Sequence, residues 1–201
     1  MNPPGSVVSL CAGMMCRVNG GKLAPMNNQL VMAAIGTDRP GLVDQVSGWV
    51  VDCGCNIADS RMMVMGGEFA ILLLVSGTQD SLTKLEGQLV QAQEQLEMSL
   101  TLKRTGAKSV ASDLVTYVAD VVALDHPGIV HKLASFFSQR NINIQDLSTS
   151  CYSAAHTGTP MFSVHLKLDV PKDSDTESLC RAFLDCCDRL NLDATIQPVK
   201  A

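Results

Sequence analysis

A short pattern of residues occurs twice in this chain, with the same internal spacing in both copies. Asp38-Arg39-Pro40-Gly41 is followed by Asn56-Ile57-Ala58-Asp59, and Asp125-His126-Pro127-Gly128 is followed by Asn143-Ile144-Gln145-Asp146. Each motif of the second copy lies 87 residues after the matching motif of the first copy. A repeat of this length, with its turn residues in register, predicts two copies of one small domain.

The spacing of apolar residues predicts the same order of elements in each copy. Short apolar runs such as 30–35 and 115–123 indicate buried strands, whereas helical spacing over 42–50 and 129–137 indicates amphipathic helices. The other expected strands are 58–65, 69–75 and 99–103, then 142–152, 161–170 and 194–199, with further helices over 82–96 and 179–190. Each copy is therefore expected to be a βαββαβ unit. That order predicts an α+β, ferredoxin-like fold: a four-stranded antiparallel sheet with two helices on one face.

Glycine and proline place the turns between these elements. Asp38 is expected to cap the helix that follows it, with Pro40 inside the first turn, where a missing N–H group costs little. Gly54 is expected to end that helix in the left-handed conformation, and Gly66-Gly67 predicts a hairpin.

Composition and charge limit the classes of function. Of the 201 residues, 46% are hydrophobic and 17% charged, so each copy can bury a core. The net charge is −5, with no Lys/Arg cluster, which argues against direct binding of nucleic acid. The eight cysteines show neither a disulfide framework nor matched pairs of metal ligands. We therefore expect reduced thiols, no metal and a cytoplasmic protein.

The limits of the two copies define the expected domains. Residues 1–28 mix Pro and Gly with a short apolar stretch and are expected to be a disordered tail, with Met26 a candidate natural start. The stretch is too short to span a bilayer, and no Lys or Arg precedes it. The first domain is expected over 29–104, a linker over 105–113 and the second domain over 114–200.

The repeated turn suits an amino-acid ligand. The first turn of a helix offers unpaired N–H groups and a partial positive charge, and glycine lets a ligand carboxylate approach the backbone. Asp38 and Asp125 could accept hydrogen bonds from an ammonium group, and Asn56 and Asn143 offer both a donor and an acceptor. The competing interpretation is ordinary turn chemistry, in which Asp and Pro-Gly serve only the fold.

These residues resemble a known family. Asp-Arg-Pro-Gly after a strand, with Asn-Ile opening the second strand, resembles the ACT domain, a small amino-acid-binding regulatory module. The tandem arrangement, with Gly-Cys-Asn-Ile-Ala-Asp-Ser-Arg at 54–61 and a Gly66-Gly67-Glu68-Phe69 turn, resembles the glycine cleavage system transcriptional repressor family. The resemblance covers residues 29–200. In ACT domains of biosynthetic enzymes an Asn usually precedes Arg-Pro-Gly, whereas this chain has Asp38; the second Asn of that family matches Asn56 and Asn143.

The resemblance implies a non-catalytic regulator without a cofactor. Its members are thought to oppose a LysR-type transcriptional activator by protein contact, with glycine relieving the repression. The implied ligand is a small amino acid, glycine or serine. The implied ligand-binding residues are Asp38, Arg39, Gly41, Leu42, Asn56 and Ile57 in the first copy and Asp125, His126, Gly128, Ile129, Asn143 and Ile144 in the second.

Oligomerisation is expected from the open edges of a lone sheet. Exposed edges are normally paired, covered or charged. The expected strands 115–123 and 161–170 carry few charges and should protect an edge poorly. We therefore expect the copies to pair with each other or with a second chain, as a homo-oligomer with the ligand at the join.

Two alternatives are an enzyme and a regulatory subunit. Of the four histidines only His126 lies in the repeated motif, and the first copy has Arg39 there, so it is no shared catalytic group. No Ser-His-Asp grouping or phosphate-binding glycine loop is evident in the sequence. An ACT subunit that controls a separate amino-acid metabolic enzyme would use the same ligand site, and the sequence does not separate it from transcriptional control.

Overall fold

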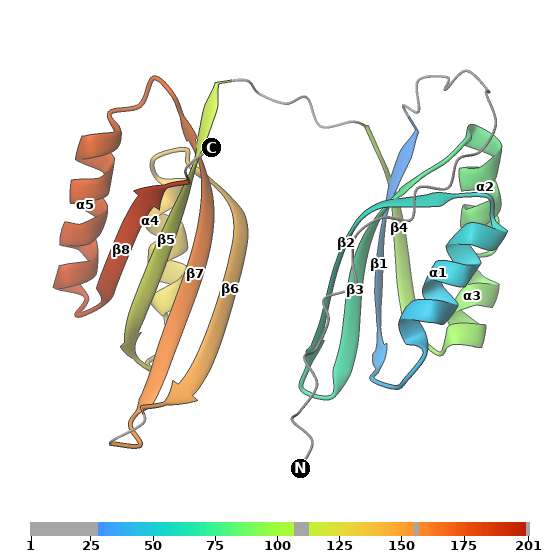
Figure 1. The fold of residues 1–201 in the computed structure, drawn as a ribbon, viewed down its shortest axis with the longest axis horizontal. Helices are drawn as coiled ribbons and strands as arrows, with labels where there is room; N and C mark the ends of the chain where they lie inside the picture. The colour runs from blue at the N-terminus through green and yellow to red at the C-terminus, as the bar shows by residue number, and fades with distance from the viewer. Residues whose placement is uncertain (1–27, 107–112, 155–156, 200–201) are drawn as a thin grey trace, which may run out of the picture. The chain divides into compact units, whose positions relative to one another are not determined.

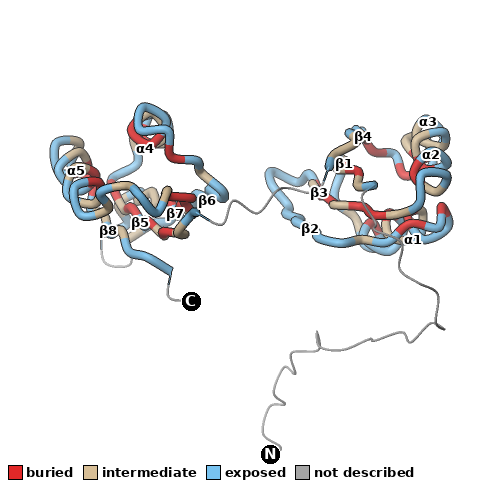
Figure 2. The backbone as a smooth tube through the Cα atoms, turned by 90° about the horizontal axis from the view of Figure 1, so that it is seen from above, coloured by how far each residue is buried: buried red, intermediate tan, exposed pale blue. Residues whose placement is uncertain are grey.

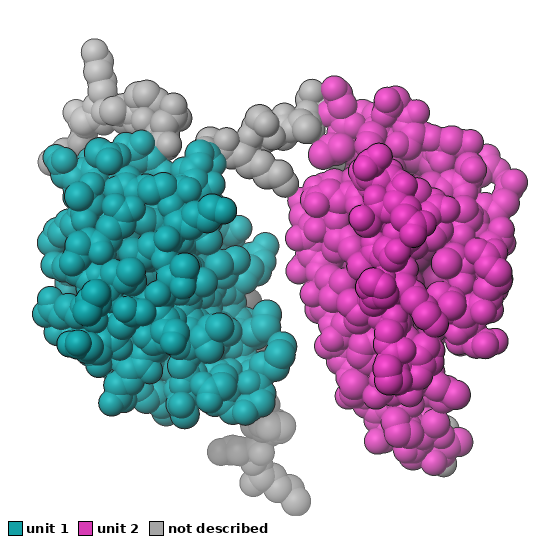
Figure 3. All heavy atoms as spheres, turned by 180° about the vertical axis from the view of Figure 1, so that it is seen from behind, with its two compact units in different colours: residues 1–108 teal, residues 109–201 magenta. Residues whose placement is uncertain are grey.

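The chain divides into two compact units. The computed structural model describes residues 28–106, 113–154 and 157–199, so the expected tail before Asn28 and most of the expected linker lie outside the described residues. The units are Met1–Lys108 and Ser109–Ala201, coloured separately in Figure 3. None of the described helices is long and apolar enough to cross a bilayer.

The first unit is a four-stranded antiparallel sheet with its helices on one face (Figure 1). The sheet order is β2-β3-β1-β4, so β1 and β3 are central and β2 and β4 are the edges. The elements are β1 (Gln29–Thr37), α1 (Leu42–Asp52), β2 (Asn56–Met65), β3 (Glu68–Ser76), α2 (Gln79–Gly87), α3 (Leu89–Leu96) and β4 (Ser99–Thr105).

The second unit repeats this arrangement, in the sheet order β6-β7-β5-β8. Its elements are β5 (Leu114–Leu124), α4 (Ile129–Ser138), β6 (Asn143–Ser153), β7 (Pro160–Pro171), α5 (Thr176–Arg189) and β8 (Asp193–Pro198). The α+β, ferredoxin-like prediction is confirmed. The expectation that strands 115–123 and 161–170 form exposed edges is wrong, because β5 and β7 are the central strands.

Each unit has its own hydrophobic core between sheet and helices (Figure 2). In β1 the buried residues alternate along the strand, as one covered sheet face requires. The buried members of β1 and α1 are Leu30, Met32, Ala34, Leu42, Val46 and Val50. In the second unit Phe136, Phe137 and Phe183 pack together, with ring centroids 5.1–5.5 Å apart.

The helix expected over 82–96 is two helices. Gln88 lies at the break, with φ −95° and ψ 3°, and ends α2 while preceding α3. Its Oε1 accepts hydrogen bonds from Trp49 Nε1 at 3.3 Å and Cys53 Sγ at 3.2 Å, which tie the break to α1. Gly87, beside it, has weak helix propensity. The described part of the first unit, residues 28–106, therefore has three helices instead of the expected two.

Glycine, rather than Asp38, begins both first helices. Gly41 and Gly128 are the N-cap residues, with φ 92° and 93°, and neither helix has a side-chain cap among the described residues. Pro40 lies ahead of the helix, so both expectations about this turn are wrong. Gly54, at φ 75°, and the Gly66-Gly67 hairpin, at φ 62° and 88°, are as expected.

Both edge strands β2 and β6 begin with a β-bulge. The register shifts between Ile57 and Asp59 in β2 and between Ile144 and Asp146 in β6. The residue between them, Ala58 or Gln145, has no partner in the register. A bulge inserts one extra residue, which interrupts the alternation of side chains along the strand. The isoleucine before the bulge and the aspartate after it therefore face opposite sides of the sheet. The bulge lets both isoleucines pack against the cores.

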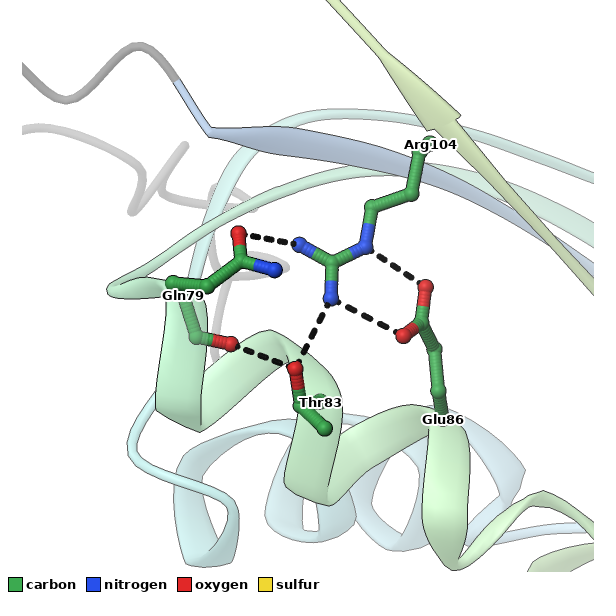
Figure 4. A network of polar contacts seen from close by, with 4 residues as sticks. All are labelled: Gln79, Thr83, Glu86 and Arg104. Atoms are coloured by element: carbon green, nitrogen blue, oxygen red, sulfur yellow. Dashed lines mark hydrogen bonds and ion pairs between the residues drawn. The ribbon is translucent and has the colours of Figure 1, made fainter.

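Arg104 fastens β4 to α2 in the first unit (Figure 4). Its Nε and Nη2 donate to the two carboxylate oxygens of Glu86, at 2.6 and 2.9 Å. Nη1 also donates to Gln79 Oε1 at 3.2 Å and Nη2 to Thr83 Oγ1 at 3.3 Å. The hydrogen bond from Arg104 lowers the pKa of the Glu86 carboxyl.

Candidate functional site

The turn after each central strand is fastened to the neighbouring hairpin. The backbone N–H of Asp38 donates to the carbonyl of Gly67 at 3.0 Å. In the second unit the N–H of Asp125 donates to the carbonyl of Pro160 at 3.3 Å. Both aspartates are exposed. Each turn is therefore held in place by a backbone hydrogen bond, and its carboxylate is exposed to solvent.

The N-terminus of α1 offers backbone N–H groups that can donate hydrogen bonds to a carboxylate. The first N–H groups of a helix have no partner within it. A Cβ built on Gly41 would meet only Gln45 Nε2, at 3.9 Å, and one on Gly128 would meet nothing within 4 Å among the described residues. Leu42 and Ile129 bury their side chains, at 2% exposure each, so only their backbone can contact a ligand.

Asn56 lies at the opposite end of the sheet from Asp38. Asn56 pairs with Ser76, which pairs with Gln29 at the start of β1, whereas Asp38 follows the end of β1. Eight strand rises of about 3.3 Å separate the two ends, about 26 Å in all. The hypothesis that Asp and Asn of one copy meet around one amine is therefore wrong.

Asn143 has the same position in the second unit. It pairs with Asp169, which pairs with Thr116 near the start of β5, while Asp125 follows the end of that strand. Asn143 Nδ2 donates to Asp169 Oδ2 at 3.4 Å, and Asp169 is buried. In the first unit the buried Ser76 donates instead to the backbone carbonyl of Asn56, at 3.4 Å. The two asparagines therefore differ in what holds their side chains.

Ile57 and Ile144, the residues after these asparagines, are half-buried against the two cores. Their side chains serve the fold. A shallow hollow of about 510 Å³ beside Asn143 and Ile144 is lined also by Ala134, Ser138, Asn141 and Ile142.

Arg39 and His126, the second residues of the two turns, make different contacts. Arg39 Nη2 donates to Gln45 Oε1 at 3.0 Å and to the carbonyl of Leu96, at the end of α3, at 3.2 Å. His126 Nδ1 lies 3.2 Å from the carbonyl of Pro127. Arg39 thus joins the turn to a groove of about 480 Å³ between α1 and α3. In the second unit a single helix, α5, takes the place of α2 and α3.

Sequence reasoning missed three neighbours of the first turn, namely Gly67, Gln45 and Leu96. The signal for Gly67 was available, because parallel strands joined by a helix start at the same end of a sheet. That topology places the end of β1 beside the β2–β3 hairpin and away from Asn56. No signal marked Leu96, whose role follows from the helix break at Gln88.

The buried thiols are not poised for chemistry. Burial raises the pKa of the Cys53, Cys55 and Cys180 thiols, and raises that of Cys187 to about 12. A thiolate is the reactive form, so a raised pKa leaves less of it at neutral pH. Among the described residues, no group of three or more His, Cys, Asp or Glu side chains could hold a metal ion.

Known proteins resemble the chain over most of its length. The ACT domain family matches residues 28–103. The glycine cleavage system transcriptional repressor of Escherichia coli (strain K12) is 29% identical over 170 residues, which cover 85% of this chain and 90% of that protein. The protein of that name from Shigella flexneri gives the same values.

Solved structures extend the likeness to both units. A crystal structure assigned as a glycine cleavage system transcriptional repressor has 30% sequence identity and a TM-score of 0.65, and the match covers 88% of this chain and 99% of that one. A crystal structure of an unknown protein from Galdieria sulphuraria, at 23% identity and a TM-score of 0.70, shows the shared fold. The chain belongs to the glycine cleavage system transcriptional repressor family of tandem ACT-domain proteins.

Proposed function

We propose that the protein is a non-catalytic, amino-acid-responsive repressor of glycine cleavage genes that acts by protein contact. The observation that carries the proposal is the likeness to glycine cleavage system transcriptional repressors over both units. The net charge of −5, without a basic cluster, supports contact with a protein over direct binding of DNA. The contacted protein in this proposal is a LysR-type activator.

The proposed ligand site combines two chains. The helix start at Gly41 and Leu42 binds the carboxylate of a small amino acid, glycine or serine, and Asp38 accepts from its ammonium group. Antiparallel pairing of β2 with β2 of a second chain would bring the partner's Asn56 to the end of the sheet where Asp38 lies. Support comes from the edge position of β2 and from its residues 62–65, which are apolar, uncharged and all more than half exposed.

Ligand binding is tested by thermal shift and calorimetry with glycine and serine. A ligand that binds only the folded state raises Tm. Asp38→Ala removes a charged hydrogen bond, worth about 1.5–3 kcal/mol, so the affinity should fall about 10- to 100-fold. Asp173→Ala, an exposed carboxylate in a turn of the second unit, is the matched control and should bind normally. If no common amino acid raises Tm at millimolar concentration, the ligand proposal fails.

The two copies are expected to contribute unequally. Gly41→Val and Gly128→Val both place a side chain where the ligand approaches, at a backbone φ that disfavours it. We expect Gly41→Val to weaken binding more, because Asn143 already donates to Asp169. Calorimetric titration of both variants with glycine gives the comparison. Equal losses of affinity would contradict this ranking.

The partner is tested with purified proteins. A tagged chain should retain a LysR-type activator of the glycine cleavage genes, release it when glycine is added, and fail to shift the promoter DNA alone. The Asp38→Ala variant should retain the activator with or without glycine. Recovery of an amino-acid metabolic enzyme, and no activator, would support the regulatory-subunit alternative instead.

A further inference from the structure

The two sheets differ in the face that their own helices leave open. In the first unit this face carries Val31, Ala33 and Ile35 on β1 and Ala70, Leu72 and Leu74 on β3, all apolar. The equivalent residues of the second unit are Val118, Asp120 and Val122 on β5 and Ser163, His165 and Lys167 on β7.

The difference is sharpest at the centre of the two faces. Leu72 is 48% exposed beside Ala33 in the first unit. At that place the second unit has a hydrogen-bonded pair, with His165 Nδ1 2.7 Å from Asp120 Oδ1. Ile35, also on the first face, is 54% exposed. Only the first face therefore presents an apolar strip among the described residues, and such strips mark interaction sites.

The apolar strip has a negatively charged residue at one edge of the sheet and a positively charged residue at the other edge. One row across the four strands runs Asp59, Leu74, Val31 and Lys103, with the carboxylate at the β2 edge and the ammonium at the β4 edge. Three strand spacings of about 4.8 Å put these charges about 14 Å apart, too far to pair within one chain. Asp59 Oδ1 instead lies 3.1 Å from Arg61 Nη1 on its own exposed edge.

We propose that this face docks against the same face of a second copy, about a two-fold axis parallel to the strands. Such a rotation lays β2 over β4 of the partner and keeps the strand direction. Asp59 then meets Lys103 of the partner subunit, and the reverse pair forms at the other edge. The apolar strips meet between the two ion pairs, as in sheet-on-sheet packing.

A hollow in the face suits this arrangement. It measures about 90 Å³ and lies at the Asp59 end of the row, lined by Val31, Asp59, Ser60, Arg61 and residues 72–74. The proposed rotation brings Lys103 of the partner subunit over it. The apolar stem of a lysine can pack in the hollow while its ammonium group reaches the carboxylate.

The first test changes the centre of the face and measures molar mass by light scattering. Leu72→Arg places a charge in the apolar strip and should halve the mass of the full chain at equal concentration. His165→Arg makes the same change at the equivalent position of the second sheet, where it can keep the pair with Asp120, and should leave the mass unchanged. Circular dichroism confirms that both variants are folded. An unchanged mass for folded Leu72→Arg would overturn the proposal.

The second test exchanges the framing charges. Asp59→Lys and Lys103→Asp each place like charges opposite one another in the proposed pair, so each should dissociate it. Mixed in equal amounts, the two variants should associate, because both ion pairs then join opposite charges. A mixture that stays dissociated would overturn the proposed axis. Association of the wild-type chain only after removal of residues 1–27 would overturn the proposal also, by placing that segment on the face.

Discussion

Gly41 and Gly48 are glycines at the start and in the middle of α1, and alanine should have opposite effects at them. Gly41 has φ 92°, where a side chain costs roughly 1–2 kcal/mol, although its Cβ would have room. Gly48 is helical, and its Cβ would meet nothing within 4 Å among the described residues. Gly41→Ala should therefore lower the free energy of unfolding by about 1–2 kcal/mol, and Gly48→Ala should raise it by about 0.5–1 kcal/mol. Urea titration measures both, and equal effects would contradict the φ argument.

The buried thiol of Cys187 should make the second unit less stable at high pH. Burial raises its pKa to about 12, from an ordinary value near 9. Between pH 9 and 12 the unfolded chain loses this proton while the folded chain keeps it, so stability falls as pH rises. Cys187→Ala should weaken that fall, whereas Cys186→Ala should retain it. Denaturant titrations at pH 8 and pH 10.5 give the comparison, and parallel losses in wild type and Cys187→Ala would contradict it.

For single residues, the sequence indicated which positions form the turns, but it did not always indicate the role of each residue. Gly54 and Gly66-Gly67 were predictable because a left-handed backbone strongly favours glycine. Asp is a preferred cap, which favours Asp38 at the helix start, yet Gly41, three residues later, is the N-cap residue. Local preference does not decide between two residues that both suit a cap.

The contact between Arg104 and Glu86 is the clearest polar link between two elements. Arg104→Lys loses the paired hydrogen bonds to both carboxylate oxygens and should cost about 0.5–1 kcal/mol, since both side chains are about one-third exposed. Glu86→Gln should cost a similar amount, and the double variant less than the sum. Because the pKa of Glu86 is lowered on folding, this stability is present above the ordinary Glu range and lost as pH falls through the folded pKa. Denaturant titration at pH 7 and pH 3.5 tests this, and full additivity would contradict it.

The strands were predictable to within a few residues, but the break between α2 and α3 was not. Leu82, Leu85 and Leu96 continue one helical spacing across the break, so apolar periodicity indicates a single helix. The contacts of Gln88 with Trp49 and Cys53 come from a helix distant in the sequence. Interactions of that kind override local pattern, and no local signal reports them.

Because the two cores share no residue, we expect the units to unfold separately. Trp49, the only tryptophan, belongs to the first unit and reports on it alone. Phe183→Ala removes a fully buried ring and should destabilise the second unit by about 3–5 kcal/mol. The circular dichroism transition should then split or shift, while the tryptophan fluorescence transition stays in place. A matching shift in fluorescence would show that the units are coupled.

For the whole molecule, the repeat was enough to predict the fold but not the geometry of the site. The spacing of Asp38 and Asn56 along the chain suggested that they meet, whereas strand direction separates them. That separation follows from the βαββαβ order itself. Strands β1 and β2 start at the same end of the sheet, so the residues after the end of β1 lie far from the first residue of β2. In the proposed site the completing residue comes from a second chain, and no pattern within the sequence identifies it.

The bulges at Ala58 and Gln145 bear on how the Asn-Ile-x-Asp motif is interpreted. The unpaired residue falls at the third position of Asn-Ile-x-Asp in both copies, with the isoleucine packed against the core and the aspartate on the other face. The spacing of that motif is thus set by the bulge, which moves the following side chains to the other face of the sheet. In this chain Asn-Ile-x-Asp therefore marks a bulged strand start, and the motif by itself does not report a ligand. In the proposed site, ligand specificity would depend on the residues around the helix start.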